Sequence, residues 1–263
     1  MQQSSGIRLA VNLGPTGDWD QLLGGARLAD ELGLDAIGVL DHYHTGRPDW
    51  SWFSGWAMWG ALAAQTSQVR LVPMVIDRLN HLPGVLAKEV SVLSRLSDGR
   101  FELGIGAGDF FEEQRAWGLP IPDAAARIDG LAETVTALQQ VWRGGPVTTT
   151  GDHVRLTEAR CLPTPIRPPR VVVGTGGSRR LIRSAVDYAD ELNVFADDKL
   201  IMDARSAIDA GGRDVALSVY IWEWPDDLDE RLARWSEIGV ARVFLTVWPP
   251  YDVITEIAAR QIT

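Results

Sequence analysis

The sequence is poor in cysteine, in long apolar runs and in clustered positive charge, and each shortage excludes a class of protein. One cysteine, Cys161, among 263 residues excludes an internal disulfide and any metal site built from several thiolates. No apolar run approaches the roughly 20 residues that a membrane-spanning helix needs. The first residues, MQQSSGIRLAV, lack the basic start and apolar core of a secretion signal. We therefore expect a cytoplasmic protein with no membrane association.

The charge balance is acidic, with 35 acidic against 25 basic residues and a formal charge of −10. Proteins that bind nucleic acid normally cluster Lys and Arg to displace phosphate counterions, and no such stripe is present. A nucleic-acid partner is therefore not expected. Any anionic ligand must be bound by a local site rather than by the field of the whole protein.

Short apolar runs alternate with amphipathic stretches along nearly the whole chain. Near-continuous apolar runs are typical of parallel strands that are covered on both faces. The predicted strands are Ile7–Leu13, Ala36–Leu40, Val69–Ile76, Phe101–Ile105, Val171–Val173, Leu192–Phe195, Val215–Trp222 and Val243–Val247. Eight strands, each followed by a helix-length connection, indicate a (β/α)8 TIM barrel in a single domain over residues 1–263, rather than an open doubly wound sheet.

Residues that start or stop helices mark the connections. Asp18 is expected to cap a helix that stops at Gly33, and Pro83 to start one that ends near Gly99. Further helices are predicted over Ala124–Trp142 and Leu228–Ile238. The segment 144–170 departs from this pattern: PVTTTGDHVRL predicts a small hairpin and CLPTPIRPP an extended tether, together a hairpin and proline-rich insertion before the fifth strand.

The second predicted strand ends in the titratable pair Asp41-His42, within GVLDHYHTGRPDW. Imidazole exchanges protons near neutral pH, so a strand-end histidine suits proton transfer or direct cofactor contact. A metal site is disfavoured, because no second cluster of His and acid completes a ligand shell. His44 is a lesser catalytic candidate. His81 and His153 are isolated, and each is as readily a satisfied or solvated side chain as a ligand.

The third and fourth strands end in irregular, glycine-rich sequence. Pro73 removes a donor from the ladder, which predicts either a bulge or room for a ring system. The stretch LGIGAGDFFEEQ has glycines that permit close backbone approach to a ligand, without the spacing of a dinucleotide fingerprint. It places Asp109 at the barrel mouth, whereas Glu112 and Glu113 are interpreted as acids in the first turn of a helix.

The fifth strand runs into VVVGTGGSRRLI. Glycines and a serine before a helix predict free backbone N–H groups that bind a phosphate. The alternative is a glycine-rich turn with solvated Arg179 and Arg180. Eleven tryptophans are present, several of them in the connection after the second strand and near the last two strands. They suggest a pocket for a flat or apolar compound, although core packing would give the same composition.

Three phrases stand in an order and spacing found in one known family: PGVLAKEVSVLSRLSDGRFELGIGAGDFFEEQRAWGLP, RIDGLAETVTALQQVWRGGPV and VVVGTGGSRRLIRSAVDYADELNVF. On these residues the chain resembles the luciferase-like family of flavin-dependent and deazaflavin-dependent oxidoreductases, roughly from Gly6 to Phe195. The resemblance implies a (β/α)8 barrel, frequently a homodimer, that holds FMN or coenzyme F420 at the carboxyl face of the sheet.

The resemblance also implies roles for individual positions. Met74-Val75 match a non-prolyl cis bond that backs the ring in many members, and Asp109 stands where deazaflavin dehydrogenases often carry glutamate. The implied catalytic residues are His42, Asp41 and Asp109. The implied cofactor-binding residues are Leu13, Asp41, His42, Met74, Val75, Gly106, Ala107, Gly108, Asp109, Gly174, Thr175, Gly176, Gly177 and Ser178. Gly46 replaces a tryptophan found in the sugar-phosphate dehydrogenases of the family, which disfavours that substrate class.

These observations favour an F420-dependent oxidoreductase that exchanges a hydride with a small organic substrate. His42 would donate or accept a proton. Asp41 would orient the His42 ring or tune it electrostatically, and Asp109 would be a second acid or base. The acidic tail of F420 would need basic residues, for which the candidates are Arg179, Arg180 and Lys199. The alternatives are an FMN-dependent monooxygenase that uses O2 and a partner reductase, and a non-catalytic flavin- or F420-binding protein. A glycoside hydrolase is disfavoured, because it has no use for the phosphate turn.

Overall fold

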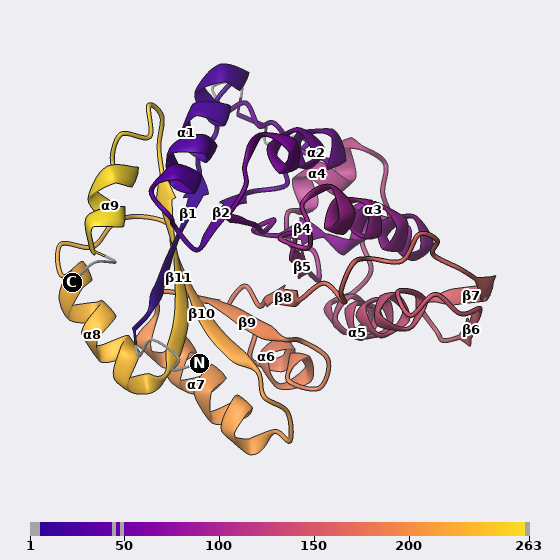
Figure 1. Ribbon diagram of the computed structural model, residues 1–263. Helices are drawn as coiled ribbons and strands as arrows, with labels where there is room; N and C mark the ends of the chain where they lie inside the picture. The colour runs from indigo at the N-terminus through magenta and orange to yellow at the C-terminus, as the bar shows by residue number, and fades with distance from the viewer. Residues whose placement is uncertain (1–5, 44–45, 48–49, 261–263) are drawn as a thin grey trace.

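The computed structural model describes residues 6–43, 46–47 and 50–260 (Figure 1). His44 lies outside the described residues. The strands are β1 (Arg8–Leu13), β2 (Ala36–Val39), β3 (Arg70–Leu71), β4 (Ile76–Asp77), β5 (Leu103–Gly106), β6 (Val147–Thr150), β7 (Arg155–Ala159), β8 (Val171–Gly174), β9 (Glu191–Phe195), β10 (Ala216–Ile221) and β11 (Val240–Val247). The helices are α1 (Trp19–Glu31), α2 (Trp56–Gln65), α3 (Pro83–Leu96), α4 (Phe111–Ala116), α5 (Ala124–Val141), α6 (Arg179–Ala185), α7 (Asp198–Ala210), α8 (Leu228–Ile238), α9 (Ile254–Arg260) and the 3-10 helix Arg78–Asn80.

Nine of the strands form one curled sheet in the order β3-β2-β1-β11-β10-β9-β8-β5-β4. Every pair of neighbours in it is parallel. Helices lie around the outside of this sheet (Figure 1). Most of its strand residues are buried, because the core of the sheet is covered on both faces. The parallel α/β architecture predicted from the sequence is confirmed.

The segment predicted as the third strand is divided in two. β3 pairs with β2 and β4 pairs with β5, so the two pieces stand at opposite ends of the sheet order. Between them lie Pro73, which has no N–H to donate, and a cis peptide bond at Met74–Val75. A Cβ at Gly104 on β5 would overlap the carbonyl oxygen of Pro73, so only glycine fits beside this bend. The predicted irregularity and cis bond are confirmed, and the prediction of one continuous strand was wrong.

The predicted helix ends are borne out. The Asp18 carboxylate accepts hydrogen bonds from the N–H groups of Asp20 and Gln21, and Gly33 after α1 has a positive φ of 71°. Pro83 stands in the first turn of α3, and Gly239 ends α8 in the left-handed conformation. These ends form where predicted because a cap depends on residues within one turn of it.

Between α5 and β8 the chain leaves the main sheet. β6 and β7 form a separate antiparallel pair, which projects at the right of Figure 1. The proline-rich segment that follows is bound to α3: Ser91 Oγ donates to the carbonyl of Pro163 at 2.6 Å, and Arg95 Nε donates to that of Thr164 at 2.6 Å. The tether is therefore held along one helix although it has no secondary structure of its own.

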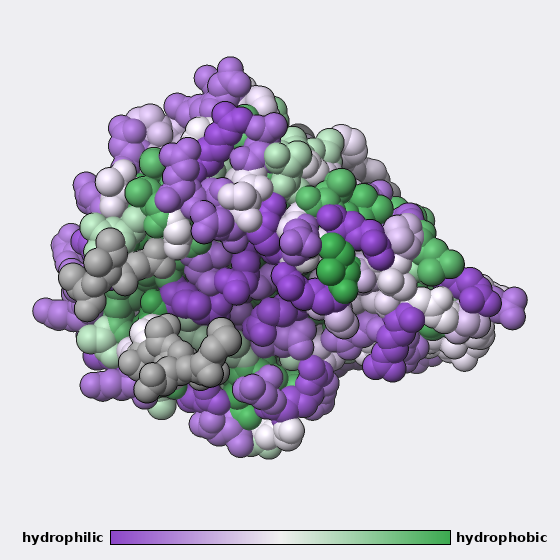
Figure 2. All heavy atoms as spheres, in the orientation of Figure 1, coloured by the Kyte–Doolittle hydropathy of each residue, from purple (hydrophilic) through white to green (hydrophobic). Residues whose placement is uncertain are grey.

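The face of the molecule in Figure 2 is hydrophilic across its middle, in keeping with the acidic composition. Green patches lie mainly on the right of that view, in the region of α3 in Figure 1, and α3 exposes Val85 and Leu96. Among the described residues, the helices are too short or too polar to cross a bilayer.

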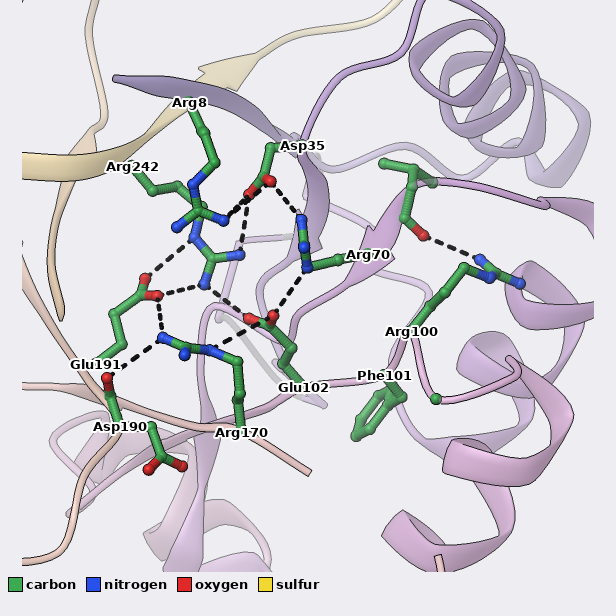
Figure 3. A network of polar contacts seen from close by, with 12 residues as sticks. Arg8, Asp35, Arg70, Arg100, Phe101, Glu102, Arg170, Asp190, Glu191 and Arg242 are labelled. Atoms are coloured by element: carbon green, nitrogen blue, oxygen red, sulfur yellow. Dashed lines mark hydrogen bonds and ion pairs between the residues drawn. The ribbon is translucent and has the colours of Figure 1, made fainter. Parts of the chain in front are cut away.

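A buried arginine joins the amino ends of the strands (Figure 3). Arg242 near the start of β11 is fully buried, and it donates to both oxygens of Glu191, at 3.1 and 2.7 Å. It also donates to Glu102 at 2.7 Å and to Asp35 at 3.2 Å. An outer ring of three less buried arginines pairs with the same acids: Arg8, Arg70 and Arg170.

The network leaves its buried charges compensated. Burial favours the neutral form of Glu191, but the charge and hydrogen bond of Arg242, the Ser218 hydroxyl and the charge of Arg170 together outweigh it and lower the pKa of this carboxyl. The pKa of Arg242 is raised by Glu191, Glu102 and Asp35 against the effect of its own burial. Arg70 also pairs with Glu102 at 3.2 Å, which connects the end of the sheet at β3 with β5 on the other side. The acids and the arginine therefore stabilise each other only as a set.

We expect Arg242→Ala to lower the free energy of unfolding by about 3 to 5 kcal/mol, because it leaves buried carboxylates without their charge partner. The matched control is Arg180→Ala, which breaks the exposed pair with Asp129 and is expected to lose less than about 1 kcal/mol. Urea unfolding followed by far-ultraviolet circular dichroism measures both. Equal small losses in the two variants would contradict the assigned role of the network.

Candidate functional site

A cavity of about 510 Å³ opens at the carboxyl ends of the strands. It is lined by residues that follow β2, β5 and β8, by β4 and the two residues before it, by the start of α5, and by side chains of β9 and the end of β10. Of the predicted site residues, all but Leu13 and Gly177 line it. Leu13 is buried in the hydrophobic core, and Gly177 lies against Leu200. Residues from separate strands are thus brought together where the sequence places a strand end.

One wall of the cavity is built on the bend in the third strand segment. Met74 and Val75 line it, and the Val75 side chain packs against two glycines. A Cβ on Gly106 would lie 2.9 Å from a methyl of Val75, and a Cβ on Gly174 would lie 3.0 Å from it. These two strand-end glycines therefore make room for Val75, which presents an apolar surface to the cavity.

The other walls are aromatic. Five aromatic side chains line the cavity: Trp50, Phe110, Phe195, Tyr220 and Trp222. The rings of Trp50 and Trp222 lie 6.0 Å apart and both contact Trp248, at 5.9 and 5.3 Å. Trp56 and Trp59 instead pack on Phe101 in the core, so the tryptophans serve both purposes considered for them.

The carboxylate beside His42 is Glu113, not Asp41. His42 Nδ1 lies 3.6 Å from Oε2 of Glu113, and its ring packs edge-on against Phe110. Glu113 is buried, and it accepts hydrogen bonds from the Tyr43 N–H at 2.8 Å and from Asn80 Nδ2 at 2.9 Å. It does lie in the first turn of α4, as predicted, but it faces the cavity rather than solvent.

Asp41 forms a second carboxylate–histidine pair, with His81. Asp41 Oδ2 lies 3.6 Å from His81 Nε2, and Asp41 Oδ1 accepts from the Gly55 N–H at 3.3 Å. Both side chains are largely buried, and the His81 ring packs on Trp56. Within the described part of the chain, these groups and their neighbours do not converge as a metal-ligand set.

Asp77 is a lining carboxyl to which the sequence reasoning assigned no role. Its Oδ1 accepts from the Leu79 N–H at 2.8 Å, and its Oδ2 accepts from Gln114 Nε2. Burial raises the pKa of Asp77 to about 6, helped by the charges of Asp109 and Glu113 and opposed by the Leu79 hydrogen bond and His81. Asp77 directly follows a strand in VPMVID, so the rule that identified Asp41 would have identified it.

The turn predicted to bind phosphate borders the cavity. Gly176 and Gly177 have positive φ values of 53° and 80°, which favour glycine. The Ser178 N–H donates to the carbonyl of Thr175 at 2.9 Å, and the Ser178 hydroxyl accepts from the Leu181 N–H. One of the three amides predicted to hold an anion is thus used within the turn, which leaves those of Gly176 and Gly177 for a ligand.

The basic residues predicted to bind an acidic tail lie outside the cavity and are paired. Arg179 donates to Asp203 at 2.7 Å, and Lys199 lies 3.8 Å from the same carboxylate. Arg180 pairs with Asp129. Among the described residues that line the cavity, only Arg127 carries a permanent positive charge. Four carboxyl groups line the same cavity: those of Asp41, Asp77, Asp109 and Glu113.

The chain is similar to several known proteins. A family model described as luciferase-like monooxygenase matches residues 4–240. An F420-dependent glucose-6-phosphate dehydrogenase of Amycolatopsis mediterranei is 30% identical over 155 residues, which are 57% of this chain and 45% of that protein. The match therefore spans less than half of the relative.

Two further proteins are similar over most of the chain. An uncharacterized protein of Mycobacterium tuberculosis is 28% identical over 243 residues, 83% of this chain and 84% of its own. The solved structure of an F420-dependent secondary alcohol dehydrogenase in complex with an F420-acetone adduct has a TM-score of 0.81, at 18% identity and over 96% of this chain and 97% of that one. At this identity the structural likeness concerns the fold.

The raised pKa of Asp77 predicts a pH-dependent contribution to stability. The folded protein binds this proton more tightly than the unfolded chain, so the group destabilises the fold above pH 6, and the effect disappears as the pH falls toward 4. We expect Asp77→Asn to exceed wild type by about 2 kcal/mol at pH 7 and to match it near pH 4. Urea unfolding from pH 4 to 7.5 measures this difference, with Asp123→Asn as control, and parallel curves would refute it.

Proposed function

The chain belongs to the luciferase-like monooxygenase family, and on that premise we propose that it is an oxidoreductase that uses coenzyme F420 to exchange a hydride with a small organic substrate. The observation that carries the proposal is the cavity, where an apolar wall, a glycine turn and a histidine meet. F420-dependent relatives recur among the similar proteins and folds. The substrate is not transferred from them, because the glucose-6-phosphate dehydrogenase matches over less than half its length.

The same proposal includes a closed (β/α)8 barrel in a single domain, in which β3 and β4 are two halves of one strand. Leu71 of β3 forms a parallel bridge with Phe101, just before β5, and Arg70 pairs with Glu102 at 3.2 Å. Both contacts join the two ends of the sheet order. We also propose a homodimer, as the family resemblance implies.

The residues present fit a cofactor of mononucleotide size. A cavity of about 510 Å³ lies within the roughly 300 to 1,000 Å³ of small-molecule sites. Met74, Val75 and Ala107 would hold the ring system, and the amides of Gly176 and Gly177 would hold its phosphate. When bound, F420 supplies the hydride chemistry, and the protein supplies orientation and proton transfer.

His42 is the proposed proton-transfer residue. Glu113 Oε2 lies 3.6 Å from Nδ1, and this carboxylate orients the ring. This leaves Nε2 as the nitrogen that can give or accept a proton in the cavity. Asp41 has an indirect role. It pairs with His81 and accepts from the Gly55 N–H, and these contacts hold the chain on either side of the site. Asp109 provides a second carboxyl at the cavity.

An FMN-dependent monooxygenase with a partner reductase is the second candidate. One observation favours it: Arg127 is the only permanently charged base among the described lining residues, and Arg179, Arg180 and Lys199 are paired with acids. An acidic tail such as that of F420 would therefore find little compensating charge, whereas FMN carries only its phosphate. A non-catalytic carrier of either cofactor is the remaining alternative.

A titration with each cofactor tests the choice. Trp50 and Trp222 line the cavity, so a bound ring quenches tryptophan fluorescence. We expect saturable quenching by F420 with a Kd at least tenfold lower than that for FMN. Riboflavin, which lacks the phosphate, is the control for the glycine turn. Tight FMN binding without affinity for F420 would move the assignment to the monooxygenase.

His42→Ala separates an enzyme from a carrier. We expect kcat/KM to fall about a hundredfold to ten-thousandfold, the usual contribution of a general acid or base, while the Kd for the cofactor changes less than about threefold. His153→Ala, on the hairpin, is the control and should match wild type. The assay follows F420 absorbance with a panel of alcohols, ketones, imines and activated alkenes. Failure of wild type to convert any of them would favour the carrier.

A further inference from the structure

Two carboxyl groups of the cavity lie on segments that cross each other closely. Asp77 ends β4, and the loop after β5 passes over it at Gly108, where a Cβ would lie 2.6 Å from Oδ1 of Asp77. Gly108 has a positive φ of 92°, so glycine is needed there for the backbone as well as for the space. The next residue is Asp109. This crossing brings its charge close enough to raise the pKa of Asp77.

Asp109 also stands over the glycine turn. A Cβ built on Gly176 would lie 3.7 Å from Oδ2 of Asp109, and Asp109 lines the cavity. An anion bound to the amides of Gly176 and Gly177 would therefore approach an ionised carboxylate. Two negative charges so close together disfavour each other, and the usual response of a carboxyl group is to take up a proton.

The other charged groups around Asp77 do not remove this repulsion. Glu113 adds a third negative charge, and His81 and the adjacent Arg78 act in the opposite direction. Arg127 lines the same cavity, where its guanidinium packs on Phe111 and donates to the Pro122 carbonyl. Among the described residues that line the cavity, four carboxyl groups stand against the single permanent positive charge of Arg127.

We propose that Asp77, which lies beneath the loop of Asp109, takes up a proton from solvent when the anionic group of the cofactor binds at the Gly176–Gly177 turn. The inference rests on the proposed function, because that function places an anion at this turn. No covalent bond other than the O–H bond forms, and the proton leaves a buffer molecule or water. Asp77 then acts as a positioning residue, because its neutral carboxyl no longer repels Asp109 and the bound anion.

The surroundings of Asp77 suit both protonation states. Gln114 is fully buried, and its Nε2 donates to Asp77 Oδ2, whereas its Oε1 has no hydrogen-bond partner among the described residues. A half-turn of this amide would present Oε1 as the acceptor for a protonated Asp77. The ionised and the neutral carboxyl can thus each be hydrogen-bonded without any movement of the backbone.

Calorimetric titration of the purified protein with F420, or with FMN if F420 does not bind, tests the proposal. At pH 6.5, in PIPES and in imidazole buffer, the difference in binding heat gives the number of protons taken up. A rise of about one unit in the pKa of Asp77, from about 6 in the free protein, corresponds to roughly half a proton at this pH and to a Kd about tenfold lower at pH 5 than at pH 8. The protonation of the free cofactor is the same for every variant, so a difference in uptake between variants arises in the complex.

Two variants assign the proton. Asp77→Asn should lower the uptake at least threefold and bind at pH 8 about as tightly as wild type at pH 5, because the repelling charge is gone. Glu112→Gln removes a neighbouring carboxyl that does not line the cavity, and it should keep the wild-type profile. If Asp77→Asn does not fold, Asp109→Asn provides the same test at an exposed position.

The outcomes separate this inference from the proposed function. Binding of either cofactor with the same proton uptake in wild type and Asp77→Asn would overturn the inference and leave the proposed function standing. Absence of binding by wild type at every pH from 5 to 8, for both cofactors, would overturn the proposed function and with it the inference. Loss of uptake in Glu112→Gln as well would show that the effect does not belong to Asp77.

Discussion

The buried charges around Arg242 are the constraint on which the rest of the structure depends. A guanidinium removed from water must be compensated, and here three carboxylates at the starts of three different strands compensate it: Asp35, Glu102 and Glu191. These contacts fix the amino ends of the strands relative to one another. The strands at which these charges stand, β2, β5, β9 and β11, are four to eight residues long and parallel, so the register set at this end also decides which residues meet at the other end, where the cavity lies.

The cavity itself depends on a local departure from regular structure. The bend at Pro73 divides the third strand segment, and Gly104 accepts the displaced carbonyl. Val75 then fills the space beside two further glycines, so that an apolar wall stands where a regular strand would have continued its ladder. The bend at Pro73 and the glycines opposite it therefore occur together, because larger side chains at those glycines would overlap the bent backbone or Val75.

The proton chemistry of the site was only partly predictable. The sequence identified His42, Asp41 and Asp109 as strand-end groups, and all three line the cavity. It did not identify Glu113 as the partner of His42, because a glutamate in the first turn of a helix is usually an exposed one. Asp77 follows the third predicted strand as Asp41 follows the second, so the same strand-end rule applies to both carboxyls.

The sequence alone determined the alternation of strands and helices, the helix caps and the glycine turns, because each of these depends on residues within a few positions of one another. It also indicated the family, because three stretches of the sequence stand in the order and spacing that the family shows. Only the tertiary structure decided that Glu113 rather than Asp41 faces His42, that Arg179 and Arg180 are paired with acids, and that Asp77 lies beneath the loop of Asp109. Those pairings join segments far apart in the chain, and strand register and packing select among several acids that local sequence leaves equivalent.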